Sequence, residues 1–272
     1  MKIHILIITL IFSLSAFAQP STQVFNILEP VKIIATYSLN YQQDSTNPSN
    51  IRNADMLLFI GENISKFVSK AYYMNDTITR KFKTFEQEQE YYMNPQRPIP
   101  NILYKLYKNY PKGKLTYTEY IPSSNFRYEE DLDLFHWNLT ADTSTIYGFK
   151  VQKALCDFGG RSWIAWFAPE LPYGDGPYKF NGLPGLILKV SDTRNHYVFE
   201  LKLIGKPGKS LVIDMLDDQY VKTKKYDFFK AADSFQEDII NRAKQAGGNN
   251  EFQQTVAKNM AQRNNPIELK RK

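Results

Sequence analysis

The amino-acid sequence predicts a β-rich α+β fold: a strongly curved antiparallel sheet or partly open barrel, with a short middle helix and C-terminal helices packed on it. Of the 272 residues, 43% are hydrophobic, 14% aromatic and 23% charged, a globular composition with a core to bury. Short β-rich runs alternate with turn residues between Ile33 and Gly205, and apolar spacing becomes helical only after Lys225. We therefore expect one sheet of about nine or ten strands joined by short links.

The first elements are a strand, a loop and a hairpin. Residues 33–41 form the first expected strand, and 55–61 and 64–68 form a hairpin that turns at 61–63. The segment 78–92 is rich in Lys, Glu and Gln and has aromatic residues at roughly helical spacing, which predicts a short surface helix. Three prolines beyond it end that helix.

The strand pattern then persists to residue 205. Further strands are expected at 115–121, 126–130, 135–139, 145–158, 161–167, 185–191 and 197–205. Two of the links have hairpin residues, Gly159-Gly160 and Asp192 to Asn195. An amphipathic helix is expected over 226–240 and a second helix over 251–263.

The N-terminus has the three regions of a signal peptide. Lys2 is positively charged, Ile3 to Leu14 is apolar, and Ala16-Phe17-Ala18 is a small-x-small cleavage site. We expect residues 1–18 to be removed, leaving one β-rich domain over 19–263 and a polar basic tail over 264–272. The apolar run is shorter than the ~20 residues that cross a bilayer. The sequence thus predicts an exported protein of the periplasm or extracellular space, with the outer membrane as a place of association.

Composition argues against several classes of function. One cysteine and three histidines give little material for a metal site, and we expect no metal and no cofactor. Cys156 lies in a strand-like run with inward-facing neighbours, so we expect a buried, inert thiol rather than a nucleophile. The net charge of +6 comes from basic residues spread among acids, which does not indicate a nucleic-acid partner. Phosphate-loop, nucleophile-elbow, zinc-protease and dinucleotide fingerprints are absent from the sequence.

The segment from Gly160 to Leu188 has the most distinctive composition. Its prolines fix φ at about −65°, whereas its glycines permit positive φ. The backbone conformation is therefore restricted at some positions and free at their neighbours. Between two strands this makes an ordered connection of about 17 residues, and long ordered loops are often functional.

This segment resembles the GLPGLI family, exported proteins of Bacteroidetes whose function is unknown. The six motif residues are Gly182, Leu183, Pro184, Gly185, Leu186 and Ile187. The resemblance extends to Trp137, 148–154, Gly160-Arg161, 165–167, 170–172, Gly176-Pro177, Lys179-Phe180 and 264–269. It implies export and a β-rich fold but no catalytic residues. Val151 stands where the family often has a cysteine, so no role of that thiol applies here.

The motif is expected to be structural first. Pro184 restricts Leu183 to extended geometry, and Gly182 and Gly185 permit the chain to reverse into the next strand. Leu183 can then close one end of the sheet, while the preceding segment, Tyr173 to Phe180, stands at the rim where a ligand or partner enters.

Five residues are candidates for binding. Arg161, Trp163 and Trp166 place stacking surface beside a bidentate cation, and Tyr173 and Tyr178 lie in the rim segment. Strand alternation puts Arg161 and Trp163 on one face and Trp166 on the other, so one tryptophan belongs to the core. In the competing interpretation, Arg161 pairs internally and both indoles are packing residues.

We expect a non-catalytic binding or carrier module for an apolar or amphipathic, lipid-like molecule or for another envelope protein. The alternative is a hydrolase of envelope or extracellular glycans that uses loop carboxylates, with Glu170 and Asp175 as the candidate pair. A third possibility is a structural partner of an outer-membrane machine. The absence of an assembled nucleophile and base in the sequence favours the first.

Overall fold

The computed structural model describes residues 24–122, 124–217, 220–245 and 251–271. The expected signal peptide, 1–18, lies outside the described residues. Within them, none of the helices has the length and apolar character needed to cross a lipid bilayer.

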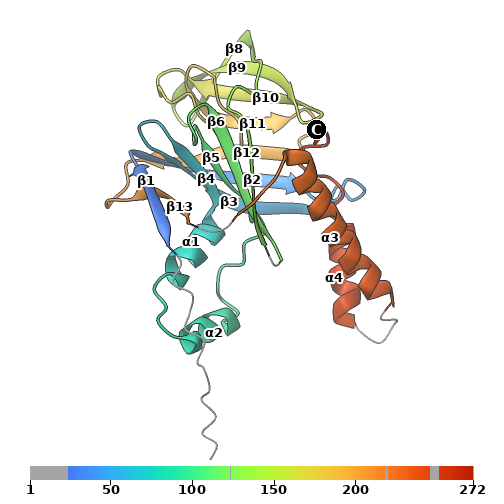
Figure 1. Cartoon of the computed structure of the whole chain (residues 1–272). Coiled ribbons are helices and arrows are strands. Elements are labelled where there is room, and N and C mark those ends of the chain that lie inside the picture. Colours follow the sequence, from blue (N-terminus) through green and yellow to red (C-terminus); the bar gives the residue numbers. More distant parts are fainter. Residues whose placement is uncertain (1–23, 123, 218–219, 246–250, 272) are drawn as a thin grey trace, which may run out of the picture.

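The predicted fold class is confirmed: twelve described strands form one strongly curved sheet that does not close into a barrel (Figure 1). Its order is β14-β7-β6-β5-β4-β3-β2-β12-β11-β10-β9-β8, antiparallel except for β14 beside β7. The strands are β2 (Ile33–Gln42), β3 (Ile51–Ile60), β4 (Ser65–Ser69), β5 (Lys105–Lys108), β6 (Lys114–Ile121), β7 (Ser124–Asp131), β8 (Asn138–Ile146), β9 (Phe149–Phe158), β10 (Arg161–Ala168), β11 (Leu186–Asp192), β12 (Tyr197–Gly205) and β14 (Val221–Lys222). A separate two-stranded sheet pairs β1 (Phe25–Pro30) with β13 (Val212–Leu216).

The predicted hairpins are confirmed where turn residues mark them. The chain reverses between β3 and β4, between β9 and β10, and between β11 and β12. Gly159 and Gly160 have φ of 60° and 81°, values that favour glycine. In the last hairpin Lys189 pairs with Glu200 and Ser191 with Val198, a register centred one residue beyond the predicted turn at 192–195.

The predicted helix over 78–92 is wrong in its extent. The chain forms α1 (Lys70–Thr79) and α2 (Phe85–Met93), with a break between them. Ser69 accepts a hydrogen bond from the Tyr72 N–H, and Thr84 accepts one from the Gln87 N–H. These two N-caps start separate helices.

The strand predictions at 135–139 and 145–158 also need correction. Tyr147 and Gly148 have φ of 51° and 82°, so the second run contains a tight hairpin turn between β8 and β9. Phe135 precedes β8 and packs against Phe180 in the core, with ring centroids 5.1 Å apart. Strands β1, β5, β13 and β14 were not expected from the sequence pattern.

The main core fills the concave face of the curved sheet. It joins side chains from strands far apart in sheet order, such as Tyr128 of β7 and Trp163 of β10, which only a curled sheet brings together. The loop between β10 and β11 adds Tyr178, Phe180 and Leu183 to this core. A smaller core on the other face lies under β13 and includes Phe59 and Ile213.

The C-terminal helices are α3 (Lys225–Gln245) and α4 (Glu251–Ala261). The first turns of α3 pack on the sheet, where Phe228 is buried against Tyr117 and Tyr128. Helix α4 lies along α3 and extends away from the sheet (Figure 1). The part of the expected tail that the structure describes, 264–271, returns to the sheet and buries Asn265 and Glu268.

Candidate ligand pocket at the end of the sheet

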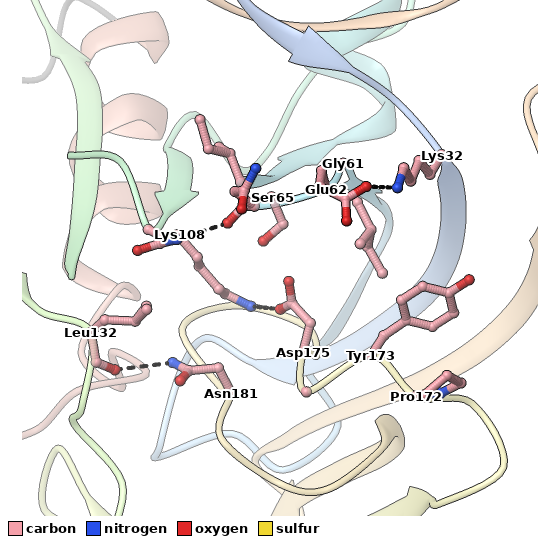
Figure 2. Close-up of a pocket in the computed structure, with 15 residues that line it drawn as sticks. Lys32, Gly61, Glu62, Ser65, Lys108, Leu132, Pro172, Tyr173, Asp175 and Asn181 are labelled. Atoms are coloured by element: carbon pink, nitrogen blue, oxygen red, sulfur yellow. Dashed lines mark hydrogen bonds and ion pairs between the residues drawn. The ribbon is translucent and has the colours of Figure 1, made fainter. Parts of the chain in front are cut away.

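A pocket of about 430 Å³ lies at one end of the sheet (Figure 2). We call it the loop pocket. Its walls are the β3–β4 turn, the start of the β5–β6 link, Leu132, and the β10–β11 loop from Pro172 to Asp175 with Asn181. Ser65 and Lys108 of the central strands also line it.

The β3–β4 turn is held by a carboxylate from β1. Glu29 Oε1 accepts hydrogen bonds from the backbone N–H groups of Asn63 and Ile64, at 3.0 and 2.6 Å. A Cβ at Gly61 would lie 2.0 Å from Glu29 Oε1, so glycine permits this approach. Asn109 Nδ2 donates to the Asn63 carbonyl at 2.9 Å and connects this wall to the next.

Lys108 anchors the β10–β11 loop from beneath. Its side chain is buried, and its ammonium group donates to Asp175 Oδ1, to the Gly176 carbonyl at 2.6 Å and to the Phe180 carbonyl at 3.0 Å. Burial lowers the pKa of Lys108, while the attraction of Asp175 acts in the opposite direction. All three ammonium protons are thus used in holding the loop, and none remains for a ligand.

Ser65 is the pocket's unsatisfied group. It lies directly opposite Lys108 in the β4–β5 pairing, and only 4% of its surface is exposed. Its Oγ is buried and has no hydrogen-bond partner in the part of the chain that the structure describes. A buried hydroxyl without a partner costs about 1–3 kcal/mol, so this hydroxyl is free to hydrogen-bond to a bound molecule.

Tyr173, Asn181 and an ion pair complete the pocket. Asn181 Nδ2 donates to the carbonyls of Leu132 and Lys179, at 3.3 and 2.8 Å, which leaves its Oδ1 as an acceptor. Tyr173 is partly exposed in the loop wall, and Lys32 pairs with Glu62 at the rim. In Figure 2, Lys108 and Asp175 point toward each other, with Ser65, Tyr173 and Asn181 around them.

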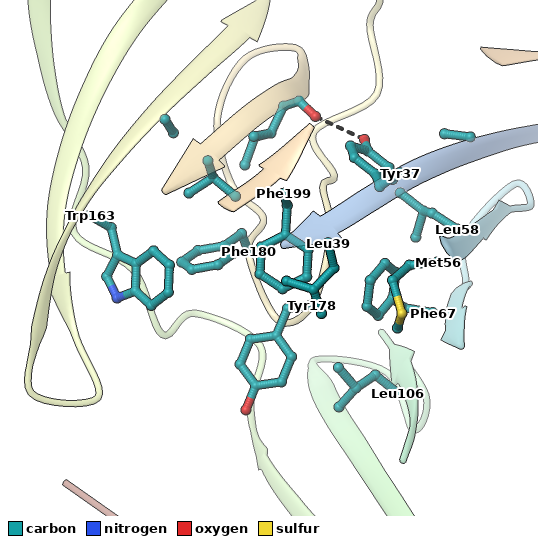
Figure 3. Close-up of a cluster of buried hydrophobic side chains, with 14 of the residues drawn as sticks. Tyr37, Leu39, Met56, Leu58, Phe67, Leu106, Trp163, Tyr178, Phe180 and Phe199 are labelled. Carbon is teal, nitrogen blue, oxygen red and sulfur yellow. Dashed lines mark hydrogen bonds between the residues drawn. The ribbon is translucent and has the colours of Figure 1, made fainter. Parts of the chain in front are cut away.

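Three of the five predicted binding residues are instead internal. Arg161 is 7% exposed and bonds to Asp192 at 2.9 Å, to Asn265 Oδ1 at 2.6 Å and to the Pro266 carbonyl at 2.7 Å. Trp163 is buried, and its Nε1 donates to the Phe158 carbonyl at 3.0 Å. Figure 3 shows the Trp163, Phe180 and Tyr178 side chains within the core of the curved sheet.

Tyr178 contacts a buried charge cluster, which we define as Glu130, Lys179, Lys225 and Glu268. Its hydroxyl donates to Glu268 Oε1 at 2.6 Å. Lys179 and Lys225 both contact Glu268, at 2.7 and 2.5 Å, and both pair with Glu130. The cluster has balanced charge and joins β7, the loop, α3 and the C-terminal segment, as buried ions require.

Of the other predicted residues, Tyr173 lies in the loop pocket, whereas Trp166 and Glu170 lie outside it. Tyr173 lines the loop pocket, whereas Trp166 is half-buried on the opposite face of β10 from Trp163. Glu170 is exposed, and its Oε1 accepts the Lys150 N–H at 3.0 Å outside the pocket. Glu170 and Asp175 therefore do not face each other across this pocket.

Sequence reasoning missed Ser65, Lys108 and Asn181. Lys108 could have been found, because it follows Leu106 by two residues in a strand and therefore lies on the same face as that inward-facing leucine. Ser65 and Asn181 have no local sequence mark of their role. Within the described residues, no group of three or more His, Cys, Asp or Glu side chains is placed to hold a metal ion.

The six-residue motif shapes the loop from inside. Gly182 and Gly185 have φ of 86° and 156°, and Leu183 is 2% exposed. Leu186 and Ile187 continue directly into β11, and the Ile187 carbonyl accepts the Tyr37 hydroxyl at 2.8 Å. The motif therefore lies behind the pocket and supports its loop wall.

Comparison with known proteins gives a short match and a distant one. Residues 160–189 match the family model described as "Protein of unknown function (Porph_ging)". No curated protein matches the chain. Two solved structures of PNGF-II, in space groups P21 and C2, are similar over 74% of this chain at 14% and 13% identity, each with a TM-score of 0.49. The chain spans about a third of their length, 32%.

Proposed function

We propose that this chain is an exported GLPGLI-type binding protein whose loop pocket holds a small polar molecule or a polar group of an envelope partner. The family match covers the segment that contains the motif, residues 182–187, and the loop wall of the pocket. We propose further that residues 19–263 are one domain and that the protein acts in the periplasm or outside the cell.

The unpartnered hydroxyl of Ser65 carries the proposal. Most buried polar side chains in native proteins have a hydrogen-bond partner, so an exception that faces a pocket points to a bound group. Asp175 Oδ2 and Asn181 Oδ1 are acceptors on the same pocket walls. Convergent polar groups beside an aromatic side chain, here Tyr173, are typical of ligand sites.

The pocket favours binding over catalysis. A serine nucleophile needs a base within hydrogen-bond reach, and Ser65 Oγ has no such partner among the described residues. Lys108 is bonded to three acceptors, and Asp175 Oδ1 accepts from Lys108 and from the Gly176 N–H, so both groups are used in holding the loop.

An apolar or lipid-like ligand is less favoured than the sequence suggested. Residues Tyr178, Phe180 and Leu183 of the loop occupy the concave face that such a carrier would use. The ligand of the loop pocket is therefore expected to be polar. The glycan hydrolase remains the alternative, and it requires a second carboxylate to reach Asp175, which Glu170 does not do in this arrangement.

Native mass spectrometry of protein purified from its own envelope tests the binding role. We expect an added mass that is retained by the wild type and reduced in Ser65→Ala and Tyr173→Ala. The matched controls are Ser49→Ala and Tyr226→Ala, whose side chains are exposed and lie outside the pocket. Equal retention in all variants, or no added mass in the wild type, would refute the proposal.

Export has its own test. Small residues at Ala16 and Ala18 predict cleavage before Gln19. The intact mass of the exported protein should begin at Gln19, and a mass that retains residues 1–18 would contradict export by this route.

A further inference from the structure

We infer that the ligand of the loop pocket is a neutral molecule rich in hydroxyl groups, a carbohydrate unit. This inference rests on the proposed binding function and names its ligand class. It follows from the charge balance of the pocket, from its free hydrogen-bonding groups and from Tyr173.

The charged side chains of the pocket are already paired. Lys108 pairs with Asp175 at the floor, and Lys32 pairs with Glu62 at the rim. Two cations and two anions leave no net charge. A cationic ligand drawn to Asp175 would approach the buried ammonium of Lys108, and an anionic ligand would approach the carboxylate of Asp175. Breaking a buried pair is costly because it leaves a charge uncompensated, so a neutral ligand fits best.

Two acceptors of the pocket walls are free. The protons of Lys108 are used by three loop acceptors, and the amide protons of Asn181 are used by two carbonyls. Asp175 Oδ2 and Asn181 Oδ1 accept no hydrogen bond from the described part of the chain. A ligand that bonds to these two atoms must supply O–H or N–H donors.

Ser65 indicates that the donor groups of the ligand are hydroxyls. Its Oγ can donate one hydrogen bond and accept others, and it is buried where water has little access. A ligand hydroxyl can donate to Asp175 or Asn181 and also exchange hydrogen bonds with Ser65. An ammonium group only donates, so it would leave the Ser65 proton without an acceptor.

Tyr173 supplies the apolar part of the contact. It stands in the loop wall beside Pro172, partly exposed and opposite the turn that Glu29 holds. A pyranose ring has hydroxyl groups around its edge and C–H groups on its faces, so it can bond to Asp175 and Asn181 while it covers the tyrosine ring. The volume of about 430 Å³ lies within the usual range for small-ligand sites, about 300–1,000 Å³.

The test uses matched probes on the mature protein. Isothermal titration calorimetry and saturation-transfer NMR would compare methyl glycosides of glucose, galactose, mannose and N-acetylglucosamine with glucosamine and glucuronate. We expect one or more neutral glycosides to bind, and to bind at least about tenfold more tightly than the charged sugars, a difference of about 1.4 kcal/mol.

Variants then assign the binding to the pocket. We expect Ser65→Ala to weaken the best glycoside about three- to tenfold, the usual value of one neutral hydrogen bond, and Tyr173→Ala to weaken it at least as much. Ser49→Ala and Tyr226→Ala should bind as the wild type does. Ser65→Ala removes an unpaired group, so its melting temperature should not fall, which separates lost binding from lost folding.

The outcomes separate the two proposals. If no neutral glycoside binds, or a charged sugar binds as tightly, the carbohydrate inference is wrong. If native mass spectrometry still shows a ligand that depends on Ser65, the binding function stands with another ligand class. If neither method shows a Ser65-dependent ligand, both proposals fail.

Discussion

Replacing Gly185 by alanine should destabilise the protein strongly, although only one methyl group is added. A Cβ at this position would lie 2.2 Å from the Ala168 carbonyl oxygen, 2.6 Å from the Ala168 carbonyl carbon and 2.9 Å from the Pro169 Cα. All three are backbone atoms at the end of β10. They cannot rotate away as a side chain can.

The magnitude follows from two costs. An ordinary carbon-to-oxygen contact is about 3.3–3.6 Å, so the two backbones must separate by about 1 Å or distort, and overpacking of this kind costs about 1–3 kcal/mol. The φ of 156° adds backbone strain, about 1–3 kcal/mol for a residue with a side chain. The sum is about 4 kcal/mol, which lowers the melting temperature by about 8–16 °C at about 2–4 °C per kcal/mol.

Thermal unfolding by circular dichroism measures this effect against two controls. Gly182 has φ of 86° but nothing within 4 Å of its Cβ position, so Gly182→Ala should cost only strain, about 1–2 kcal/mol. Gly208 has open space and no positive φ, so Gly208→Ala should be nearly neutral. We expect the losses to follow the order Gly185, Gly182, Gly208.

The order matters more than the absolute values. A Gly185→Ala variant that melts with the wild type, or that loses less than Gly182→Ala, would show that the close packing of the motif against β10 does not support the fold. The motif would then have to be assigned a role at the surface.

Three further predictions follow from buried groups. Burial raises the pKa of Glu268, but attraction to Lys179 and Lys225 outweighs burial, so the net pKa lies below 4.5, the unfolded value. The ionised Glu268 therefore stabilises the fold fully above pH 4.5, and this stabilisation is lost as the pH falls through the folded pKa. Melting curves should show a steeper loss below pH 4.5 in the wild type than in Glu268→Gln, and equal slopes would contradict this. Burial raises the pKa of the Cys156 thiol to about 12. Iodoacetamide at pH 7.5 should therefore label Cys156 in the native protein at less than about a hundredth of the rate in the unfolded protein. Rapid labelling of the native protein would show an accessible thiolate. Arg161→Lys loses the planar guanidinium contacts to the C-terminal segment, so amide exchange in 264–271 should rise at least about tenfold, and unchanged exchange would mean that other contacts hold it.

Local sequence was enough for much of the sheet. Hairpins at 61–63, 159–160 and 192–195 were predictable because glycine, asparagine and aspartate adopt the turn geometry whatever surrounds them. The faces of β10 were predictable because alternation is a property of the strand itself. By contrast, the hairpin at Tyr147 was missed, because a tyrosine with positive φ is uncommon and does not mark a turn.

Few of the candidate site residues could be predicted from the sequence. Arg161, Trp163 and Tyr178 have the chemistry of binding residues, yet their partners are Asn265, Phe158 and Glu268 of the same chain. A residue's chemistry does not reveal whether its partner is internal or external. That depends on which distant segments meet.

The fold class, the main hairpins and the stiff loop that contains Gly185 could be predicted, since these depend on backbone geometry and on the spacing of neighbouring residues. The exposed face of the loop, the burial of Lys108 beneath it and the unpartnered Ser65 hydroxyl among the described residues could not be predicted. Burial and hydrogen-bond satisfaction are properties of contacts between segments, and no short stretch of sequence contains them. Ser65 and Asp175 are 110 residues apart and meet only because the sheet curls and Lys108 holds the loop against its end.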